Sequence, residues 1–183
     1  MLKKLKRHLL NWFVSNYKHR KRAGFQNSVE QALASAYRQI ERSKYAFLVS
    51  QGDRFPDARL IEPLFEKDGF VFWIGTSPKS RKVEQIKKDS QVTLAFSNQK
   101  DNSNLLVKAS AELVDDIALR AQHWKPYWRL FFPSGPKGDD YLLIKLNVKE
   151  IEVLDFSQNV VPEPFGLKPF HLVRSEFGWK LGG

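Results

Sequence analysis

The chain has 183 residues, enough for one domain with a substantial hydrophobic core. It contains no cysteine, which excludes disulfide bonds and thiolate chemistry, and its four histidines lack the paired spacing of a zinc or haem site. Aromatic residues make up 13% of the sequence and suit a packed β core or a surface that binds a flat ring.

The formal net charge of +10 is unevenly distributed. Residues 1–22 hold eight Lys and Arg and no acidic residue, whereas the rest of the chain holds 22 basic and 20 acidic residues, a net charge of only +2. Apolar residues recur at helical spacing within this segment. They are Leu2, Leu5, Leu9, Trp12 and Phe13. The pattern predicts a basic amphipathic helix in an N-terminal arm, residues 1–26.

Two interpretations of the arm remain open. The helix packs on its own domain or on a dimer partner, or it anchors the protein to an anionic membrane surface through residues 1–22. Its apolar stretches are too short to span a bilayer, and no small-residue cleavage site of a signal peptide follows them. Nucleic acid is a less favoured partner, because the basic residues are not interleaved along a wider surface. The expected location is the cytoplasm, peripheral to the membrane if the arm is an anchor.

The pattern after the arm predicts one helix and then a series of short strands. Residues 28–31 fit a capping box, and an apolar face follows that predicts a helix ending near Ser43. Strands are expected at residues 45–50, 57–65, 70–74, 91–96, 104–114 and 141–154. Pro63 indicates an edge or a bulge in the second of these. Short strands joined by tight turns favour a barrel or a sandwich.

Two further segments carry distinct expectations. Residues 70–74 are apolar without alternation, which predicts a strand covered on both faces, with a second subunit as one source of the outer cover. The pattern from Ile117 to Phe131 predicts one helix, stopped by Pro133, that carries Trp124 and Trp128 on one face. These two rings are expected mainly to pack the helix on the barrel. The tail, residues 157–183, ends in an extended segment suited to pairing along a sheet edge.

A cluster of hydrogen-bond donors follows the strand at residues 70–74. Gly75 to Pro78 break that strand, and Ser80, Arg81 and Lys82 begin a short basic helix, residues 80–88. The free N–H groups of a helix start, a hydroxyl, a guanidinium and an ammonium all donate to phosphate oxygens. The segment therefore indicates a phosphate site, with a solvated basic helix as the alternative.

The order of these features resembles the FMN-binding split-barrel family of pyridoxamine-phosphate-oxidase-like flavoproteins. Arg59, then Thr76, then Ser80 to Lys82, then a strand opening at Asn104 carry the resemblance, which covers roughly residues 29–155. The segment from His123 resembles the general stress protein branch. The resemblance implies a mainly β (α+β) fold, a split β-barrel over residues 27–156 with flanking helices, that binds FMN as a homodimer.

The resemblance also implies roles for individual residues. The expected cofactor-binding residues are Arg59, Leu60, Ile61, Thr76, Ser80, Arg81, Lys82, Asn104 and Trp124. Residues 59–61 would lie along the flavin, Thr76 would bond the phosphate or the ring, and the helix start would clamp the phosphate. Asn104 would approach the ring, commonly across the dimer interface, and Trp124 would contact the ring edge. Two rival roles are an ion pair of Arg59 with Asp57 and a strand cap at Asn104.

Two departures from the family pattern limit the function. Residues 173–183 lack the substrate-gripping pattern of true pyridoxamine-phosphate oxidases, so vitamin B6 oxidation is not expected, and Leu154 stands where an aromatic residue is usual. No general base is evident, so any catalysis would rest on the redox chemistry of the flavin. Three functions follow: an FMN-dependent oxidoreductase, a flavin-binding stress-response module without turnover, and a split barrel that binds haem or a deazaflavin.

Overall fold

The computed structural model describes residues 2–22, 28–162 and 168–182, with side chains described from residue 4 to residue 20 in the first range. The helices are α1 (Leu2–Arg22), α2 (Val29–Arg42), α3 (Arg81–Lys88) and α4 (Ile117–Gln122), together with the 3₁₀ helix η1 (Pro126–Leu130). The strands are β1 (Ala46–Gln51), β2 (Pro56–Ile61), β3 (Leu64–Glu66), β4 (Val71–Thr76), β5 (Gln91–Asn98), β6 (Ser103–Val114), β7 (Leu142–Asp155), β8 (Phe170–Ser175) and β9 (Gly178–Leu181).

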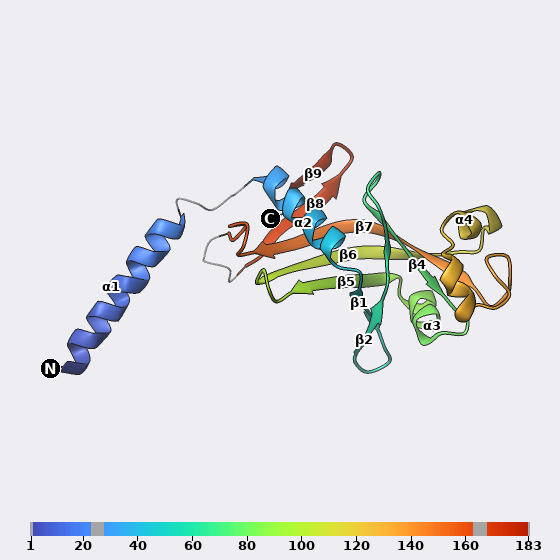
Figure 1. Cartoon of the computed structure of the whole chain (residues 1–183), viewed down its shortest axis with the longest axis horizontal. Helices are drawn as coiled ribbons and strands as arrows, with labels where there is room; N and C mark the ends of the chain where they lie inside the picture. The colour runs from blue at the N-terminus through green and yellow to red at the C-terminus, as the bar shows by residue number, and fades with distance from the viewer. Residues whose placement is uncertain (1, 23–27, 163–167, 183) are drawn as a thin grey trace.

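The strands form an antiparallel sheet in the order β2-β1-β5-β6-β7-β4-β3, and β8 and β9 continue from the second half of β7 (Figure 1). β2 and β3 lie at opposite ends of this order although only Glu62 and Pro63 separate them in the chain. The sheet therefore has to curl until its two edges approach each other. This curled, incompletely closed sheet with flanking helices confirms the expected fold class.

The expected single strand at residues 57–65 is wrong, because the chain forms β2, leaves the sheet at Glu62 and Pro63, and then forms β3. Proline has no N–H to donate to a strand partner, so it stands where the chain crosses from one edge to the other. This crossing places Glu62 beside the segment that contains η1.

The core lies inside the curl of the sheet, with α2 across one end. Leu48, Phe72 and Phe96 are fully or almost fully buried, and Ala32 and Ala36 turn the apolar face of α2 onto them. The expected start of α2 is confirmed, because the Ser28 hydroxyl caps the helix by accepting from the Gln31 N–H at 3.2 Å. The C-terminal tail pairs along β7 as expected.

β4 is covered on both faces, but this chain supplies both covers. Phe72 and Ile74 enter the main core, whereas Trp73 packs on the other face with Trp128, Tyr141 and Leu143. A second subunit is therefore not needed to explain this apolar strand.

The expected continuous helix from Ile117 to Phe131 is wrong. α4 ends at Gln122, and η1 begins at Pro126. Lys125 is extended, with φ −104° and ψ 132°, as expected of the residue before a proline. The break separates Trp124 from Trp128, so these two rings are not on one helix face.

The N-terminal segment forms the expected helix, α1, which lies apart from the sheet in Figure 1. No helix in the described part of the chain is both long enough and apolar enough to cross a membrane.

Candidate functional site

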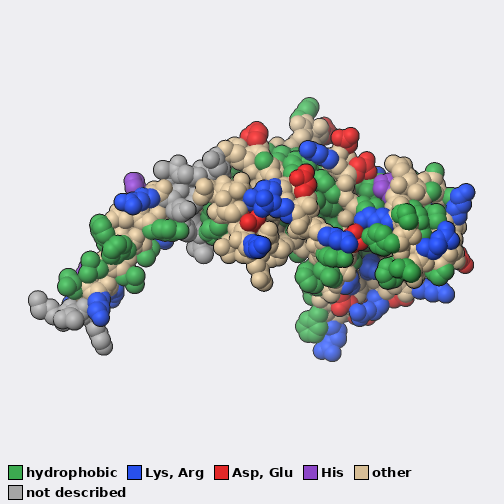
Figure 2. Space-filling view, in the orientation of Figure 1, with side chains coloured by type: hydrophobic (Ala, Val, Ile, Leu, Met, Phe, Trp, Pro, Cys, Tyr) green, Lys and Arg blue, Asp and Glu red, His purple; other side chains and the backbone are tan. Residues whose placement is uncertain are grey.

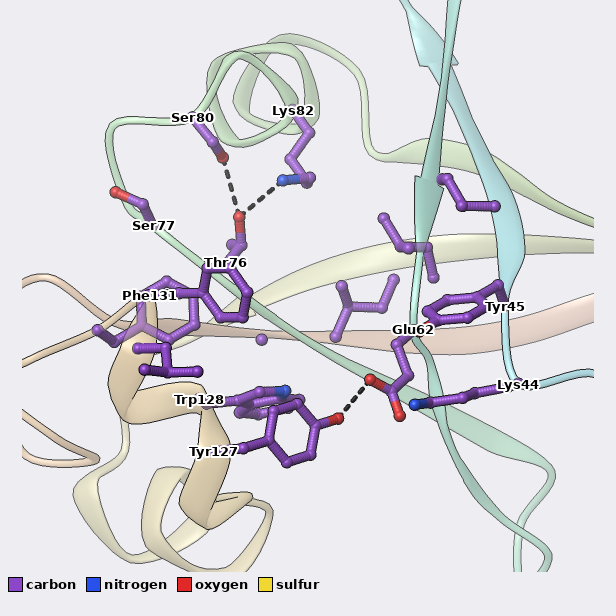
Figure 3. Close-up of a pocket in the computed structure, with 16 residues that line it drawn as sticks. Lys44, Tyr45, Glu62, Thr76, Ser77, Ser80, Lys82, Tyr127, Trp128 and Phe131 are labelled. Atoms are coloured by element: carbon purple, nitrogen blue, oxygen red, sulfur yellow. Dashed lines mark hydrogen bonds between the residues drawn. The ribbon is translucent and has the colours of Figure 1, made fainter.

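A cavity of about 620 Å³ lies where the end of β2, the end of β4 and the start of α3 face η1 (Figure 3). This volume is within the range of small-molecule and cofactor sites, about 300–1,000 Å³. The lining residues are Lys44, Tyr45, Leu60, Ile61, Glu62, Ile74, Gly75, Thr76, Ser77, Ser80, Lys82, Tyr127, Trp128, Leu130, Phe131 and Phe132. Five of the residues expected at the cofactor site are in this set: Leu60, Ile61, Thr76, Ser80 and Lys82.

One end of the cavity is polar and cationic. The buried Thr76 accepts a hydrogen bond from the Lys82 ammonium at 2.8 Å, and its hydroxyl lies 3.1 Å from that of Ser80 (Figure 3). Ser80 occupies the N-cap position of α3, but its side chain makes no capping hydrogen bond. The three side chains therefore converge on one point instead of closing the helix end.

Lys82 is partly buried, and burial lowers the pKa of its ammonium, with a smaller lowering from the nearby Arg59 guanidinium. Within the described part of the chain no carboxylate forms an ion pair with Lys82, because Asp57 pairs with Arg59 and Arg81 instead. The site thus holds a half-desolvated cation whose neighbours increase the local positive potential. An anion bound at this point would offset both the burial of the Lys82 ammonium and the positive potential of its neighbours.

Arg59 and Arg81 lie outside the cavity lining. The Arg59 guanidinium donates to the Ser50 hydroxyl at 2.6 Å and to the Gln85 side chain at 2.7 Å, so it ties β2 to β1 and α3. It also lies 3.8 Å from Asp57, the rival ion pair considered for it. The Arg81 side chain is 82% exposed. In this chain Arg59 positions α3, and Lys82 is the cation of the α3 start that reaches the cavity.

The middle of the cavity is apolar and aromatic. Trp128 lies against Gly75 so closely that a Cβ at this position would stand 2.6 Å from the indole ring. Glycine is therefore required for the contact between β4 and η1. Phe131 is 69% exposed at the opening, and its ring lies beside that of Phe132, with centroids 6.4 Å apart.

The opposite end carries a hydrogen-bonded cluster around Glu62. The Tyr127 hydroxyl donates to its carboxylate (Figure 3). The Lys125 ammonium also donates to it, at 2.9 Å. Burial alone would raise the pKa of Glu62, but these two hydrogen bonds, together with the charges of Lys125 and Lys44, outweigh burial and the net pKa is lowered. Burial and the bond to Glu62 raise the pKa of Tyr127. At neutral pH Glu62 is therefore an ionised acceptor and Tyr127 a neutral donor.

Asn104 and Trp124 are also outside this cavity. Asn104 pairs with Leu154 at the far end of β7, whereas Thr76 pairs with Leu142 at its near end. Twelve residues of strand separate the two, roughly 40 Å at about 3.3 Å per residue. Trp124 packs edge-on against Tyr141, with ring centroids 5.1 Å apart. Its neighbour in η1, Trp128, lines the cavity instead.

Sequence patterns did not predict four residues of this cavity as site residues: Glu62, Tyr127, Trp128 and Phe131. Glu62 and Tyr127 are 65 positions apart, and no local periodicity links them. The useful signals were the two prolines, Pro63 and Pro126, because each one breaks a regular element beside the cavity.

Comparison with known proteins places the chain in a family. Residues 31–167 match the family described as "Pyridoxamine 5'-phosphate oxidase like". The chain belongs to this pyridoxamine 5'-phosphate oxidase like family. Comparison with curated proteins gave no significant match.

Solved structures support the family's fold. A Clostridium acetobutylicum protein related to general stress protein 26 superposes with a TM-score of 0.64 at 21% identity, covering 71% of this chain and 92% of that one. A Nostoc punctiforme protein described as pyridoxamine 5'-phosphate oxidase-related and FMN binding gives 0.62 at 17% identity, covering 85% and 95%. A general stress FMN/FAD binding protein from Xanthomonas citri gives 0.59 at 18% identity, covering 70% and 90%.

Proposed function

We propose that this chain is an FMN-binding flavoprotein and an FMN-dependent oxidoreductase distinct from true pyridoxamine-phosphate oxidases. The observation that carries the proposal is the convergence of Lys82, Thr76 and Ser80 at one end of an aromatic-lined cavity. A phosphate dianion supplies the charge that the Lys82 ammonium lacks within the described structure, and it accepts hydrogen bonds from both hydroxyls.

The rest of the cavity fits the remaining parts of FMN. Leu60, Ile61 and Trp128 offer apolar surface for a flat tricyclic ring, as cofactor sites with a few polar anchors commonly do. Two of the structurally similar proteins are described as FMN or FMN/FAD binding, which supports the same cofactor here. When bound, the flavin supplies the capacity to accept and donate electrons.

The chain's own side chains would bind and orient the flavin and its substrate. Lys82 holds the phosphate, and Trp128 fixes the width of the ring site through its contact with Gly75. Tyr127, held by Glu62, presents a neutral phenol at the other end of the cavity. Because Glu62 already accepts two hydrogen bonds, it orients Tyr127 and Lys125 and is poorly placed to serve as a free base.

A homodimer is part of this proposal. Asn104 is too far along β6 to reach its own chain's cavity, so a role for Asn104 at the flavin requires the copy from a partner subunit. The outward face of β1 and β2 presents Phe47 and Leu60, which are 50% and 58% exposed and directly opposite each other in register. We assign the dimer contact to this face.

Absorbance and flavin fluorescence of the purified protein test the proposal. We expect flavin bands in the near-ultraviolet and blue, quenched FMN fluorescence on titration, and bleaching of the bound flavin under NADH or NADPH without oxygen. Bound FMN that no nicotinamide donor or artificial donor bleaches would overturn the oxidoreductase part and leave a binding module. A haem spectrum, or no FMN binding at all, would overturn the proposal as a whole.

A further inference from the structure

We propose that α1 lies in the plane of an anionic lipid bilayer and holds the flavin domain at the membrane surface. The proposal does not depend on the flavin, because it concerns a segment that contributes nothing to the cavity. Its evidence is the distribution of apolar and basic side chains along the helix.

α1 presents an apolar stripe to solvent. Leu5, Leu9 and Trp12 follow one another at helical spacing, with Phe13 beside them, and these four side chains are between 51% and 63% exposed. The rings of Trp12 and Phe13 meet edge to face, with centroids 5.1 Å apart. Figure 2 shows apolar side chains gathered on the helix away from the body of the protein. A contiguous exposed apolar stripe of this kind commonly marks a contact with a membrane or another protein.

The basic residues of α1 indicate that its partner is anionic. Lys4, Arg7 and Lys18 lie on the opposite side of α1 from the stripe, and all three are exposed. Residues 1–22 carry a charge of +8, compared with +2 for the remainder of the chain. The separation is incomplete, because Leu10 and Val14 lie three and seven residues after Arg7 on its side of α1, and both are exposed. A helix that combines a Leu, Trp and Phe stripe with this many Lys and Arg still matches both layers of an anionic bilayer interface.

Two other partners would each account for only one part of the pattern, either the basic residues or the apolar stripe. Duplex nucleic acid would neutralise the basic residues but would leave Leu9, Trp12 and Phe13 in water. Packing of α1 against a second α1 would cover the stripe but would bring two strongly basic helices together, which is unfavourable. The described helices include none that could span a bilayer, so α1 would lie on the membrane and not through it.

Flotation of the full-length protein with lipid vesicles provides the test. We expect binding to vesicles of phosphatidylcholine with roughly one third phosphatidylserine and at least about tenfold weaker binding to phosphatidylcholine alone, because each basic residue near an anionic surface contributes attraction. High salt should release the protein, because it screens that attraction. Equal binding to both kinds of vesicle, or no binding to either, would overturn the proposal.

Two double variants of equal net charge measure the contribution of the apolar stripe to binding apart from that of the basic residues. Leu9→Gln with Trp12→Gln removes apolar groups from the stripe, and Asn11→Gln with Ser15→Gln places the same two glutamines outside the stripe without removing an apolar group. We expect the first pair to weaken vesicle binding at least about tenfold and the second to change it by less than about twofold. Equal losses in both pairs would refute burial of the stripe. A fall in oligomer size with unchanged vesicle binding would show that the stripe mediates self-association.

The fluorescence of Trp12 also tests whether this residue enters the lipid. Vesicles whose acyl chains carry bromine should quench part of the tryptophan fluorescence of the wild-type protein, and Trp12→Phe should bind the same vesicles but lose that quenching. Quenching that persists in Trp12→Phe would mean that the flavin domain itself, and not α1, enters the lipid. Stronger retention on duplex DNA than on vesicles at equal salt would assign the helix to nucleic acid instead.

Discussion

Lys82 occupies an environment that disfavours its own charge, and this conflict has measurable consequences at the scale of one residue. Its pKa is lowered from the ordinary value of 10.5, chiefly by burial and then by Arg59. A group that is harder to protonate in the folded state than in the unfolded state reduces stability wherever it is protonated. We therefore expect Lys82→Met to raise the melting temperature of the cofactor-free protein at neutral pH.

The pH dependence of the stability gained by Lys82→Met follows from the lowered pKa of Lys82. The advantage of Lys82→Met should be full below the lowered pKa of folded Lys82, shrink as pH rises through that pKa, and vanish near 10.5, where the unfolded lysine also loses its proton. Scanning calorimetry at several pH values measures it. A variant less stable than wild type at neutral pH would show that the Thr76 hydrogen bond outweighs the desolvation of the ammonium.

Gly75 sets the distance between β4 and η1. A methyl group at this position would collide with the Trp128 ring, so Gly75→Ala should destabilise the fold by about 1–3 kcal/mol and weaken FMN binding by displacing Trp128. Combining it with Trp128→Phe should restore part of the stability, because the smaller ring leaves room for the Cβ. Additive losses in the double-mutant cycle would show that the two residues are not in contact.

At the scale of elements, a buried carboxylate joins α2 to the end of β7. Asp155 is fully buried and accepts hydrogen bonds from Ser35 at 2.7 Å, Arg38 at 2.6 Å and Ser157 at 2.7 Å. Burial alone would raise the pKa of Asp155, but these bonds outweigh it and the net pKa lies below 3.8. The stabilisation is therefore complete above about pH 3.8 and is lost as pH falls through the lowered pKa of the folded state.

We expect Asp155→Asn to reduce the free energy of unfolding by about 3 kcal/mol, because it leaves Arg38 without its buried partner. Asp101→Asn is the control, since Asp101 is partly exposed and contacts Arg42 at 2.9 Å and Arg38 at the longer distance of 3.8 Å, and it should cost no more than about 1 kcal/mol. Urea denaturation measures both. Equal costs would mean that burial of Asp155 adds nothing.

Sequence patterns predicted elements better than their connections. The capping box at Ser28 and the strands at residues 45–50, 91–96 and 104–114 depend on local periodicity, and the structure agrees with them. The helix expected at residues 117–131 failed because an apolar period was followed across Pro126, although proline restricts the residue before it. The meeting of Glu62 with Tyr127 and of Gly75 with Trp128 depends on how the sheet curls, and no local pattern encodes that.

The candidate site shows the same difference between what local patterns predict and what the folded chain decides. Ser80 and Lys82 were predicted from the helix start and Thr76 from the family resemblance, and the structure brings the three side chains together. Arg59 and Arg81 were expected beside them, but their charges are used elsewhere: Arg59 holds α3, and Arg81 faces solvent. Sequence gives the number of cations near a helix start, whereas burial decides which one reaches the cavity.

At the scale of the whole molecule, the outward face of β1 and β2 predicts a homodimer. Light scattering at micromolar concentration should give twice the chain mass of 21.3 kDa, as closed two-fold dimers commonly do. Phe47→Glu should dissociate the dimer and weaken FMN binding together, because Asn104 would no longer be supplied by the partner. Phe55→Glu is the control, since Phe55 is 72% exposed in the turn before β2 and away from the face. A wild-type monomer with flavin bound would refute the prediction.

The most direct test of the proposed site compares FMN with riboflavin, which lacks the phosphate, by isothermal titration of wild type, Lys82→Met and Arg81→Ala. A charge-assisted hydrogen bond contributes about 1.5–3 kcal/mol, and ~1.4 kcal/mol is a factor of ten. Lys82→Met should therefore weaken FMN binding by about tenfold or more and leave riboflavin nearly unchanged. Arg81→Ala removes the same charge one residue away, on an exposed side chain, and should change either affinity by less than about threefold. Equal losses of FMN and riboflavin in folded Lys82→Met, or a larger loss of FMN in Arg81→Ala, would contradict the assignment of this cavity as a flavin phosphate site.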